Sequence, residues 1–268
     1  MKSAACILQA VFILQTVLLS LLPHIARGEE SRLDRTFESV EEAYGIVIIR
    51  QNPSFPETTR WGKIEGENAA AKDIHRYERL FCEEFSLYPQ TLIQKTKLRR
   101  VVLCGQLKFV GQRRYAVPDF EHDTYYLDVG TEYLSASYLR HVIHHDFFHI
   151  VDYQDDGRLY EDERWKLLNP PDFRYGNGGA AALNNPDTGA LTNKYPGFLT
   201  HYSTTGVEED KAEVFSHLIV SRQFVEKRVK EDQVLKEKVD LIRTLAGDFC
   251  EELDQDFWKR AGQIDRTE

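Results

Sequence analysis

The sequence contains only four cysteines in 268 residues, and one of them, Cys6, lies in the apolar segment at the N-terminus. The other three, Cys82, Cys104 and Cys250, are too few for a scaffold held together by disulfides, so stability must come mainly from an ordinary hydrophobic core. An oxidising compartment allows one disulfide and one remaining thiol, and the pair predicted is Cys82 with Cys104, because these two lie closest in sequence. The alternative is that all three are buried apolar thiols.

The sequence also lacks an excess of basic residues. It contains 34 lysines and arginines against 43 acidic residues, which gives a formal net charge of −9 at pH 7. An acidic protein is poorly suited to attract nucleic acid or an anionic membrane by its charge. We therefore expect neither as a partner.

Long hydrophobic runs are absent from most of the sequence. The one that is present extends from Ala4 to Leu22; Lys2 precedes it, and the small residues Ala26 and Gly28 follow it, as in a cleaved secretory signal peptide. We therefore expect residues 1–28 to be removed and the protein to be secreted, with no stable membrane association afterwards. An uncleaved membrane anchor is the alternative, because the run is long enough to span a bilayer.

No internal repeat is present, so residues 29–268 are expected to form a single domain that begins with a short polar lead-in. Strand patterns come early and helical patterns late, which predicts an α+β fold. Strands are predicted at residues 44–50, 100–104, 107–110 and 124–130. Helices are predicted at residues 68–87 and 208–258, the latter with a polar break near 225–234 and a further break at Gly247.

Residues 144–149 read HHDFFH, which nearly matches the zinc metallopeptidase motif HExxH with aspartate in the place of glutamate. His145 and His149 are four residues apart, so on a helix both imidazoles can reach one tetrahedral zinc ion. Residues 133–143 run into the motif without proline or glycine, which predicts that helix. The residue after the first histidine normally takes a proton from zinc-bound water, and here it is Asp146.

The surroundings of the motif allow further predictions. The strand at 124–130 comes directly before the helix, and a free edge there could pair with an extended peptide. His141 has no carboxylate at the base position, and His144 has no histidine four residues later. We interpret both as flanking or core residues, with support of a metal ligand as a further role.

A third protein ligand is needed. A metzincin pattern requires glycine at position 152 and histidine at position 155, but the sequence has Asp152 and Asp155. Asp155 is one candidate ligand. Glu209 and Glu213, four apart in a predicted helix, are another, since one can bind zinc while the other accepts from the ring N–H of a ligating histidine. The alternative interpretation of this pair is a solvated acidic first turn favoured by the helix dipole.

Taken together, these residues resemble the glutamate-type zinc metallopeptidases, or gluzincins, and within them the branch that contains the putative zinc-binding metallopeptidase family and the catalytic domain of anthrax toxin lethal factor. In that branch a tyrosine lies seven residues before the ligand glutamate, and an alanine-glutamate pair and a phenylalanine follow it. Those places are held here by Tyr202, Glu209, Ala212, Glu213 and Phe215. The resemblance implies a zincin-like fold with an active-site helix, a small mixed sheet and a helical C-terminal half.

The resemblance also implies a role for each site residue. The implied ligands of Zn²⁺ are His145, His149 and Glu209. Asp146 holds the position of the base, and Glu213 supports a ligating histidine. The resemblance implies that Tyr202 donates a hydrogen bond to the oxyanion. A phenol near zinc can also do this on chemical grounds.

A long irregular segment, residues 169–197, separates the two halves of the predicted site. Segments of this length in compact domains are often binding loops or lids, and the alternative is a disordered insertion. It resembles a stretch of the same peptidase family, with matching residues at Trp165, Asn169, Phe173 and Tyr175.

We therefore predict a secreted zinc-dependent metallopeptidase that acts on a peptide or protein substrate. Asp146 departs from the family pattern, because its side chain is one methylene shorter than glutamate and reaches about 1.5 Å less far. The main alternative is consequently a zinc-binding pseudoenzyme that binds peptides or proteins without cutting them. A third hypothesis is an ordinary structural or interaction protein, which predicts no stoichiometric metal.

Overall fold

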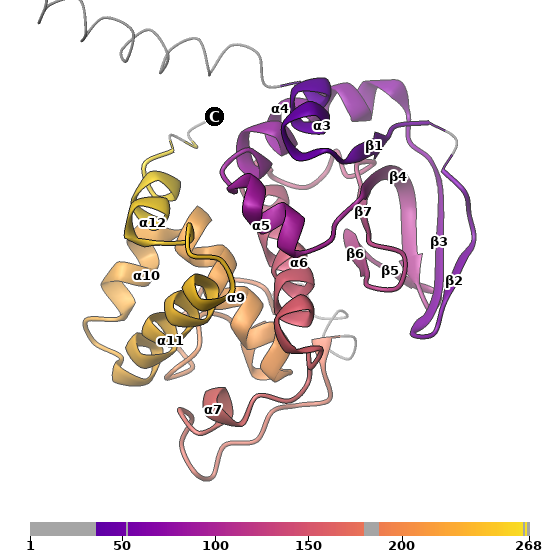
Figure 1. The fold of residues 1–268 in the computed structure, drawn as a ribbon. Helices are drawn as coiled ribbons and strands as arrows, with labels where there is room; N and C mark the ends of the chain where they lie inside the picture. The colour runs from indigo at the N-terminus through magenta and orange to yellow at the C-terminus, as the bar shows by residue number, and fades with distance from the viewer. Residues whose placement is uncertain (1–35, 52, 180–187, 265, 267–268) are drawn as a thin grey trace, which may run out of the picture.

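The computed structural model describes residues 36–51, 53–179, 188–264 and 266, so the predicted signal peptide at 1–28 lies outside the described residues. A mixed β-sheet forms one half of the described structure and a group of helices forms the other (Figure 1). Helix α6 (Ala136–Asp156) lies between them and packs against both. The predicted α+β class is confirmed.

The sheet contains seven strands among the described residues. They are β1 (Val47–Ile49), β2 (Glu57–Thr59), β3 (Gly62–Asn68), β4 (Arg100–Phe109), β5 (Gln112–Arg113), β6 (Ala116–Asp119) and β7 (Thr124–Asp128). Their order is β2, β3, β4, β7, β6, and β1 and β5 also pair with β4. Strand β4 runs parallel to β1 and β7 and antiparallel to β3 and β5, so the sheet is mixed.

Two strand predictions need correction. Residues 100–104 and 107–110 were expected to form separate strands, but the chain continues as one strand, β4, through Gln106 at φ 53°. The predicted free edge at 124–130 is also wrong, because β7 pairs on one side with β4 and on the other with β6. The edge on this side is β6, whose Val117 lies opposite Tyr126.

The N-terminal helices cover the sheet. They are α3 (Phe37–Tyr44), α4 (Ala71–Phe85) and α5 (Gln90–Lys95). Helix α3 lies where the sequence predicted only a polar lead-in and the start of a strand. Thr36 forms a capping box with Ser39, and Phe37 packs against Phe81 in the core. The short amphipathic pattern of α3 is therefore stabilised mainly by burial against α4.

The C-terminal half is helical, as predicted. Its helices are the 3₁₀ turn η1 (Tyr202–Thr204), α9 (Val207–Val220), α10 (Arg222–Arg228), α11 (Gln233–Phe249) and α12 (Gln255–Ala261). Helix α9 is buried along almost its whole length, and the other three helices pack against it. The break predicted at Gly247 is wrong, because α11 passes through Gly247 and ends at Phe249. Asp254 then caps α12.

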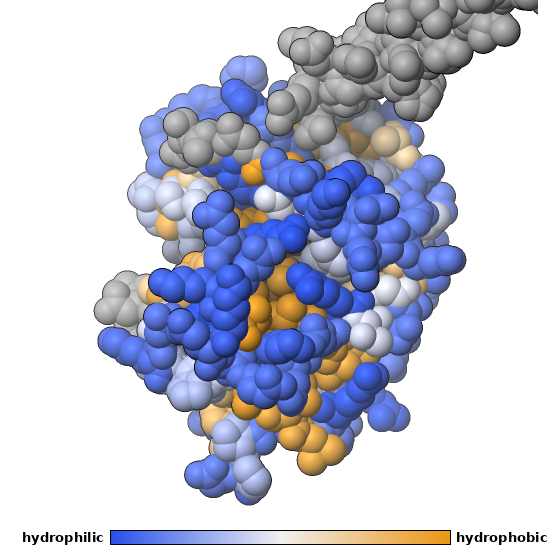
Figure 2. All heavy atoms as spheres, turned by 90° about the vertical axis from the view of Figure 1, so that its left-hand side faces the viewer, coloured by the Kyte–Doolittle hydropathy of each residue, from blue (hydrophilic) through white to orange (hydrophobic). Residues whose placement is uncertain are grey.

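The face that carries these C-terminal helices is mostly hydrophilic, with apolar residues gathered in patches between the polar ones (Figure 2). This pattern fits amphipathic helices that bury one side against α9. Over the described part of the chain, none of the helices has both the length and the apolar character needed to cross a membrane.

No disulfide forms between the described cysteines. Cys82, Cys104 and Cys250 are all buried thiols. The predicted pair of Cys82 with Cys104 is therefore wrong, and the alternative of buried apolar thiols is confirmed. Both cysteines serve as core residues, with Cys82 on α4 and Cys104 on β4 in two different apolar clusters.

Candidate metal centre

Helix α6 carries the HHDFFH motif in its middle. The Ser135 side chain accepts a hydrogen bond from the Tyr138 amide at the start, and Gly157, in the left-handed conformation with φ 78°, ends the helix. Because 3.6 residues make one turn, His145 and His149 share a face while His144 points elsewhere. The shared face is turned towards α9, and both histidines are more than nine-tenths buried.

Three side chains from α6 and α9 converge on one point. Nε2 of His145 lies 2.9 Å from Oε2 of Glu209, and Nε2 of His149 lies 3.5 Å from the same oxygen. Zinc bonds of about 2.0–2.1 Å in tetrahedral geometry separate ligand atoms by roughly 3.3 Å. The two distances lie on either side of that value, so these residues fit a tetrahedral zinc ion.

The other nitrogen of His145 faces Glu213. Nδ1 lies 3.0 Å from Oε1 of Glu213, at an angle too bent for a well-formed hydrogen bond. His141 Nε2 lies 2.9 Å from the same oxygen, and the Thr200 hydroxyl donates to Oε2 at 2.7 Å. The charge of Glu213 thus favours a proton on Nδ1 of His145, so that Nε2 is the nitrogen available to a metal ion.

A second group of possible ligands shares His145. It consists of His141, His145 and Glu213, all buried. His141 stacks on His217 with 4.4 Å between ring centroids, and neither His141 nor Glu213 lines the pocket beside the histidine pair. His145, His149 and Glu209 do line one. Access therefore favours these three as the ligand set and Glu213 with His141 as their support.

The histidines and carboxylates of this centre shift one another's pKa values. Burial by itself lowers the pKa of His145, but the contacts with Glu209 and Glu213 outweigh it and raise that pKa well above its usual value. Burial by itself raises the pKa of Glu209, but His145 and His149 hold it well below the ordinary range. The carboxylate therefore stays ionised and attracts a cation. Protons and a metal ion compete for the histidine nitrogens.

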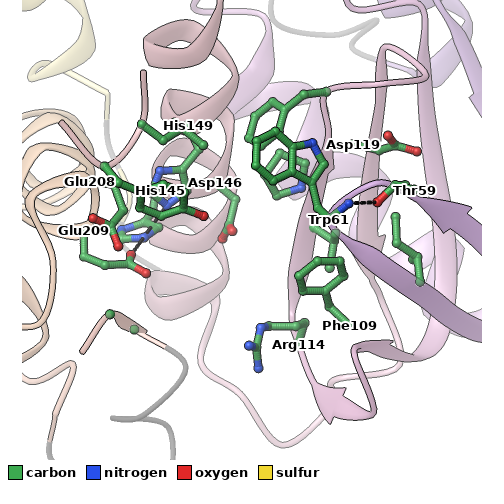
Figure 3. Close-up of a pocket in the computed structure, with 18 of the residues that line it drawn as sticks. Thr59, Trp61, Phe109, Arg114, Asp119, His145, Asp146, His149, Glu208 and Glu209 are labelled. Atoms are coloured by element: carbon green, nitrogen blue, oxygen red, sulfur yellow. Dashed lines mark hydrogen bonds and ion pairs between the residues drawn. The ribbon is translucent and has the colours of Figure 1, made fainter. Parts of the chain in front are cut away.

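Asp146 lines the same pocket, one residue after His145 (Figure 3). No other described residue donates a hydrogen bond to its carboxylate. Burial raises its pKa, while the neighbouring His145 and His149 oppose that change. A carboxyl group with a raised pKa and a free oxygen can both take and return a proton.

Tyr202 contacts one oxygen of the Glu209 carboxylate and the histidines face the other. Its hydroxyl donates to Oε1 of Glu209 at 2.9 Å, and its ring lies 5.8 Å from the His145 ring. Burial and the Glu209 charge raise the pKa of Tyr202 well above its usual value. The phenol therefore keeps its proton and remains a hydrogen-bond donor.

The pocket has two unlike walls (Figure 3). One wall holds His145, Asp146, His149 and Glu209, and the sheet supplies the other with Trp61, Phe109 and Arg114 among its side chains. Sequence reasoning missed this second wall entirely. This wall depends on strand pairing, because the pairing of β3 with β4 and of β6 with β7 brings these residues together from distant segments.

Asp155 does not join the histidine pair. It lines a separate hollow together with Asp152 and Asp162. In that hollow the buried Lys211 ammonium pairs with Asp152 at 2.6 Å and with Asp162 at 3.4 Å. Helix α6 continues to Asp156, so Asp155 is carried about 1.7 turns past His149 and away from the pocket.

The segment predicted as a binding loop is anchored next to the metal centre, as far as it is described; residues 180–187 lie outside the described chain. The Trp165 indole and the Tyr175 hydroxyl both donate to Oδ2 of Asp210, at 2.8 and 2.6 Å. Asn169 donates to the Tyr175 hydroxyl, and Phe173 packs on Phe198. These contacts exclude a disordered insertion for the described part. Asp210 itself was missed from sequence.

Gly179 of this segment lies directly against Glu209 and Tyr202. A Cβ at this position would lie 2.1 Å from both the Tyr202 hydroxyl and Oε1 of Glu209. Any side chain would therefore displace Glu209 or Tyr202, so the close approach requires glycine. The loop backbone forms the rim of the pocket at this point.

Comparison with known proteins agrees with this geometry. The model of a family described as "Putative zinc-binding metallo-peptidase" matches residues 113–249, just over half of the chain. A crystal structure described as a putative zinc-binding metallo-peptidase from Bacteroides caccae is 15% identical in sequence, with 87% of this chain and 91% of that chain covered and a TM-score of 0.50. That likeness supports the fold. Among curated proteins, none matches significantly.

Proposed function

Because the chain belongs to the family of putative zinc-binding metallo-peptidases, we propose that it is a secreted zinc-dependent metallopeptidase that hydrolyses peptide bonds. The observation that carries the proposal is the convergence of His145, His149 and Glu209 at the base of an open pocket. Two neutral imidazoles and one carboxylate are a ligand set that zinc takes in catalytic sites, with a further position open for water or substrate.

Zinc held by these residues would supply a Lewis acid for the scissile carbonyl and lower the pKa of a bound water. The protein supplies the proton handling. Asp146 receives the proton of the attacking water and returns it to the leaving amine, for which its raised pKa suits it. Its shorter side chain reaches the water either directly or through a second water.

Two further residues complete the proposed mechanism. Tyr202 donates its O–H to the substrate oxygen on which negative charge develops, in exchange for its present contact with Glu209. Glu213 keeps His145 in the tautomer and orientation that zinc requires, because the carboxylate faces Nδ1.

Elemental analysis of the purified mature protein tests the proposal. We expect one zinc per chain in the wild type and in Asp155→Ala, and a loss of most of the zinc in His149→Ala and Glu209→Ala. Zinc retained in Glu209→Ala but lost in Asp155→Ala would move the third ligand to Asp155. A wild type that takes up no zinc from excess metal would overturn the peptidase proposal.

Asp146 also supports a second candidate function. A pseudoenzyme that binds peptides without cutting them would keep the zinc ligands and lose the efficient base. Screening a peptide library with wild type and Asp146→Glu separates the two functions. Cleavage by the wild type supports the peptidase, and cleavage only after Asp146→Glu supports the pseudoenzyme.

Secretion is proposed from the N-terminal sequence alone. Expression of the full sequence in a eukaryotic secretory host, followed by N-terminal sequencing of the protein in the medium, tests it. We expect a product that begins near Glu29. A cell-bound product that retains residues 1–28 would instead identify a membrane anchor.

A further inference from the structure

One carboxylate of the pocket has no task in the proposed mechanism. Four carboxylates line the pocket: Asp119, Asp146, Glu208 and Glu209. Asp119 accepts from the His122 ring and from two backbone amides. Glu209 faces both histidines and Tyr202, and Asp146 is assigned to the water. Glu208 remains.

The Glu208 carboxylate is buried in the first turn of α9 and lines the pocket. The residue is 7% exposed, and no lysine, arginine or histidine of the described chain forms an ion pair with it. Lys211, one turn along the same helix, pairs with Asp152 and Asp162 instead. A carboxylate at a pocket wall that has no ion-pair partner can accept a charge-assisted hydrogen bond from a cationic ligand.

The backbone around Glu208 leaves room for its carboxylate at the pocket wall. A Cβ at Gly206 would lie 2.3 Å from Oε1 of Glu208, and a Cβ at Gly178 would lie 3.7 Å from it. The carboxylate therefore lies against the Gly206 backbone, where any side chain would displace it, whereas a side chain at Gly178 would make only an ordinary contact. In Figure 3 Glu208 lies beside His149 and Glu209, on the wall of the metal centre.

An aromatic ring lines the same end of the pocket. Tyr160 is 60% exposed, lines the pocket and lies close enough to Glu208 and Glu209 for their charges to contribute to its raised pKa after the effect of burial. A carboxylate beside an accessible aromatic ring is a suitable environment for an ammonium or guanidinium group.

We propose that Glu208, with the Tyr160 ring, binds a cationic group of the peptide next to the scissile bond. The group is an arginine or lysine side chain or a free α-amino terminus, which share this chemistry. The proposal rests on the proposed metal centre. It adds a substrate class: peptides with a positive charge beside the bond that is cut.

Four hydroxamates test the proposal by binding, whether or not the protein is catalytically efficient. N-acetyl-arginine hydroxamate and its neutral analogue N-acetyl-citrulline hydroxamate test the side chain. Norleucine hydroxamate and N-acetyl-norleucine hydroxamate test the free amine. Dissociation constants for zinc-loaded wild type, Glu208→Gln, Glu208→Asp and Glu163→Gln are measured by calorimetry, after zinc content is checked for each.

In the wild type we expect one cationic compound to bind about tenfold more tightly than its neutral partner, as one charge-assisted contact allows. Glu208→Gln should abolish that preference without weakening the neutral compound, and Glu208→Asp should keep part of it. Glu163→Gln removes the same charge from exposed α7 (Glu163–Lys166) and should keep all of it. The pair that shows the preference identifies the source of the charge.

Equal binding within both pairs, or a preference that survives Glu208→Gln, would overturn the role of Glu208 and leave the metal centre intact. Absence of zinc from the wild type would overturn both proposals, and elemental analysis detects this before any hydroxamate is added.

Discussion

Helix α6 carries two buried histidine–carboxylate clusters on different faces, built around neighbouring histidines. On one face His144 Nε2 lies 2.9 Å from Glu84 Oε2, and the Tyr88 hydroxyl lies 2.7 Å from Nδ1. On the other face His145 meets Glu209 and Glu213. Residue types and burial are alike in the two clusters, so neither distinguishes a metal centre from a structural ion pair.

Charge balance does distinguish them. Arg140 donates to Glu84 Oε1 at 2.9 Å, and Arg266 binds both oxygens of Glu84 at 2.8 and 2.9 Å. In contrast, no lysine or arginine of the described chain pairs with Glu209 or Glu213. The first cluster therefore already contains its cations, whereas the second contains two carboxylates and needs one from outside.

The two clusters also differ in their access to solvent. The side chains of His144 and Glu84 are both 0% exposed, whereas His145, His149 and Glu209 form part of a pocket wall. A closed, neutralised cluster fixes helices α4 and α6 together. An open and anionic one can take up a metal ion and a substrate. Variants in each of the two clusters test this difference.

The largest expected effect is the loss of stabilisation by zinc in Glu209→Ala. Zinc at a thousand times its dissociation constant stabilises a protein that binds it only when folded by about 4 kcal/mol. We expect such an increment in the wild type and none in Glu209→Ala, measured by urea unfolding with zinc and with a chelator. Glu84→Gln is the control and should keep the full increment. An equal increment in Glu209→Ala would remove this residue from the ligand set.

Glu84→Gln should destabilise the protein by about 3–5 kcal/mol, because it leaves Arg140 and Arg266 without their buried counter-charge. The loss should be the same with and without zinc, which separates it from the first prediction. Asp240→Asn, which breaks the exposed pair with Lys236, is the control and should cost less than about 1 kcal/mol. A cost for Glu84→Gln as small as that control would contradict a structural role.

Lowering the pH should remove the contribution of the same cluster to the free energy of unfolding. Burial by itself raises the pKa of Glu84, but His144 and Arg266 lower it from its ordinary value of 4.5 to about 2. A carboxyl group with a lowered folded pKa stabilises the protein above its unfolded pKa and loses this contribution as the pH falls through the folded value. About 3 kcal/mol should thus be lost between pH 4.5 and 2. The difference in stability between wild type and Glu84→Gln, measured without zinc, should shrink over this range; a constant difference would contradict it.

The parts of the site predictable from sequence are those set by local spacing. The i, i+4 relation of His145 with His149, and of Glu209 with Glu213, needs only a helix, and both helices have uninterrupted patterns. The pairing of the two helices does not follow from spacing. It came from the resemblance, through the seven-residue offset of Tyr202 from Glu209, and the structure brings these residues together.

What could not be predicted depends on contacts between distant segments. Glu84 lies 60 residues before His144 and has no local pattern that marks it as its partner. The pairing of β6 with β7 removes the expected free edge, and α3 forms only because α4 buries it. Glu208 and Glu209 are adjacent acids in one turn, and only the fold directs one towards the histidines and leaves the other without a cation.

The smallest expected effect concerns the support of His145. Glu213→Gln keeps the size of the side chain but replaces the charge that faces Nδ1, so the imidazole loses its fixed tautomer and part of its basicity. Zinc affinity, measured by competition with a chelator, should fall about 10–100-fold. Thr200→Val is the control, because it removes the hydroxyl that donates to the far oxygen of Glu213 but keeps the Glu213 charge, and it should weaken zinc binding less. The same hydroxyl also accepts from the Ser203 amide, so the folded state of this variant is checked first. If Glu213→Gln bound zinc as tightly as the wild type, the carboxylate would be only a buried acceptor for His141, and the two faces of α6 would differ less than their charge balance indicates.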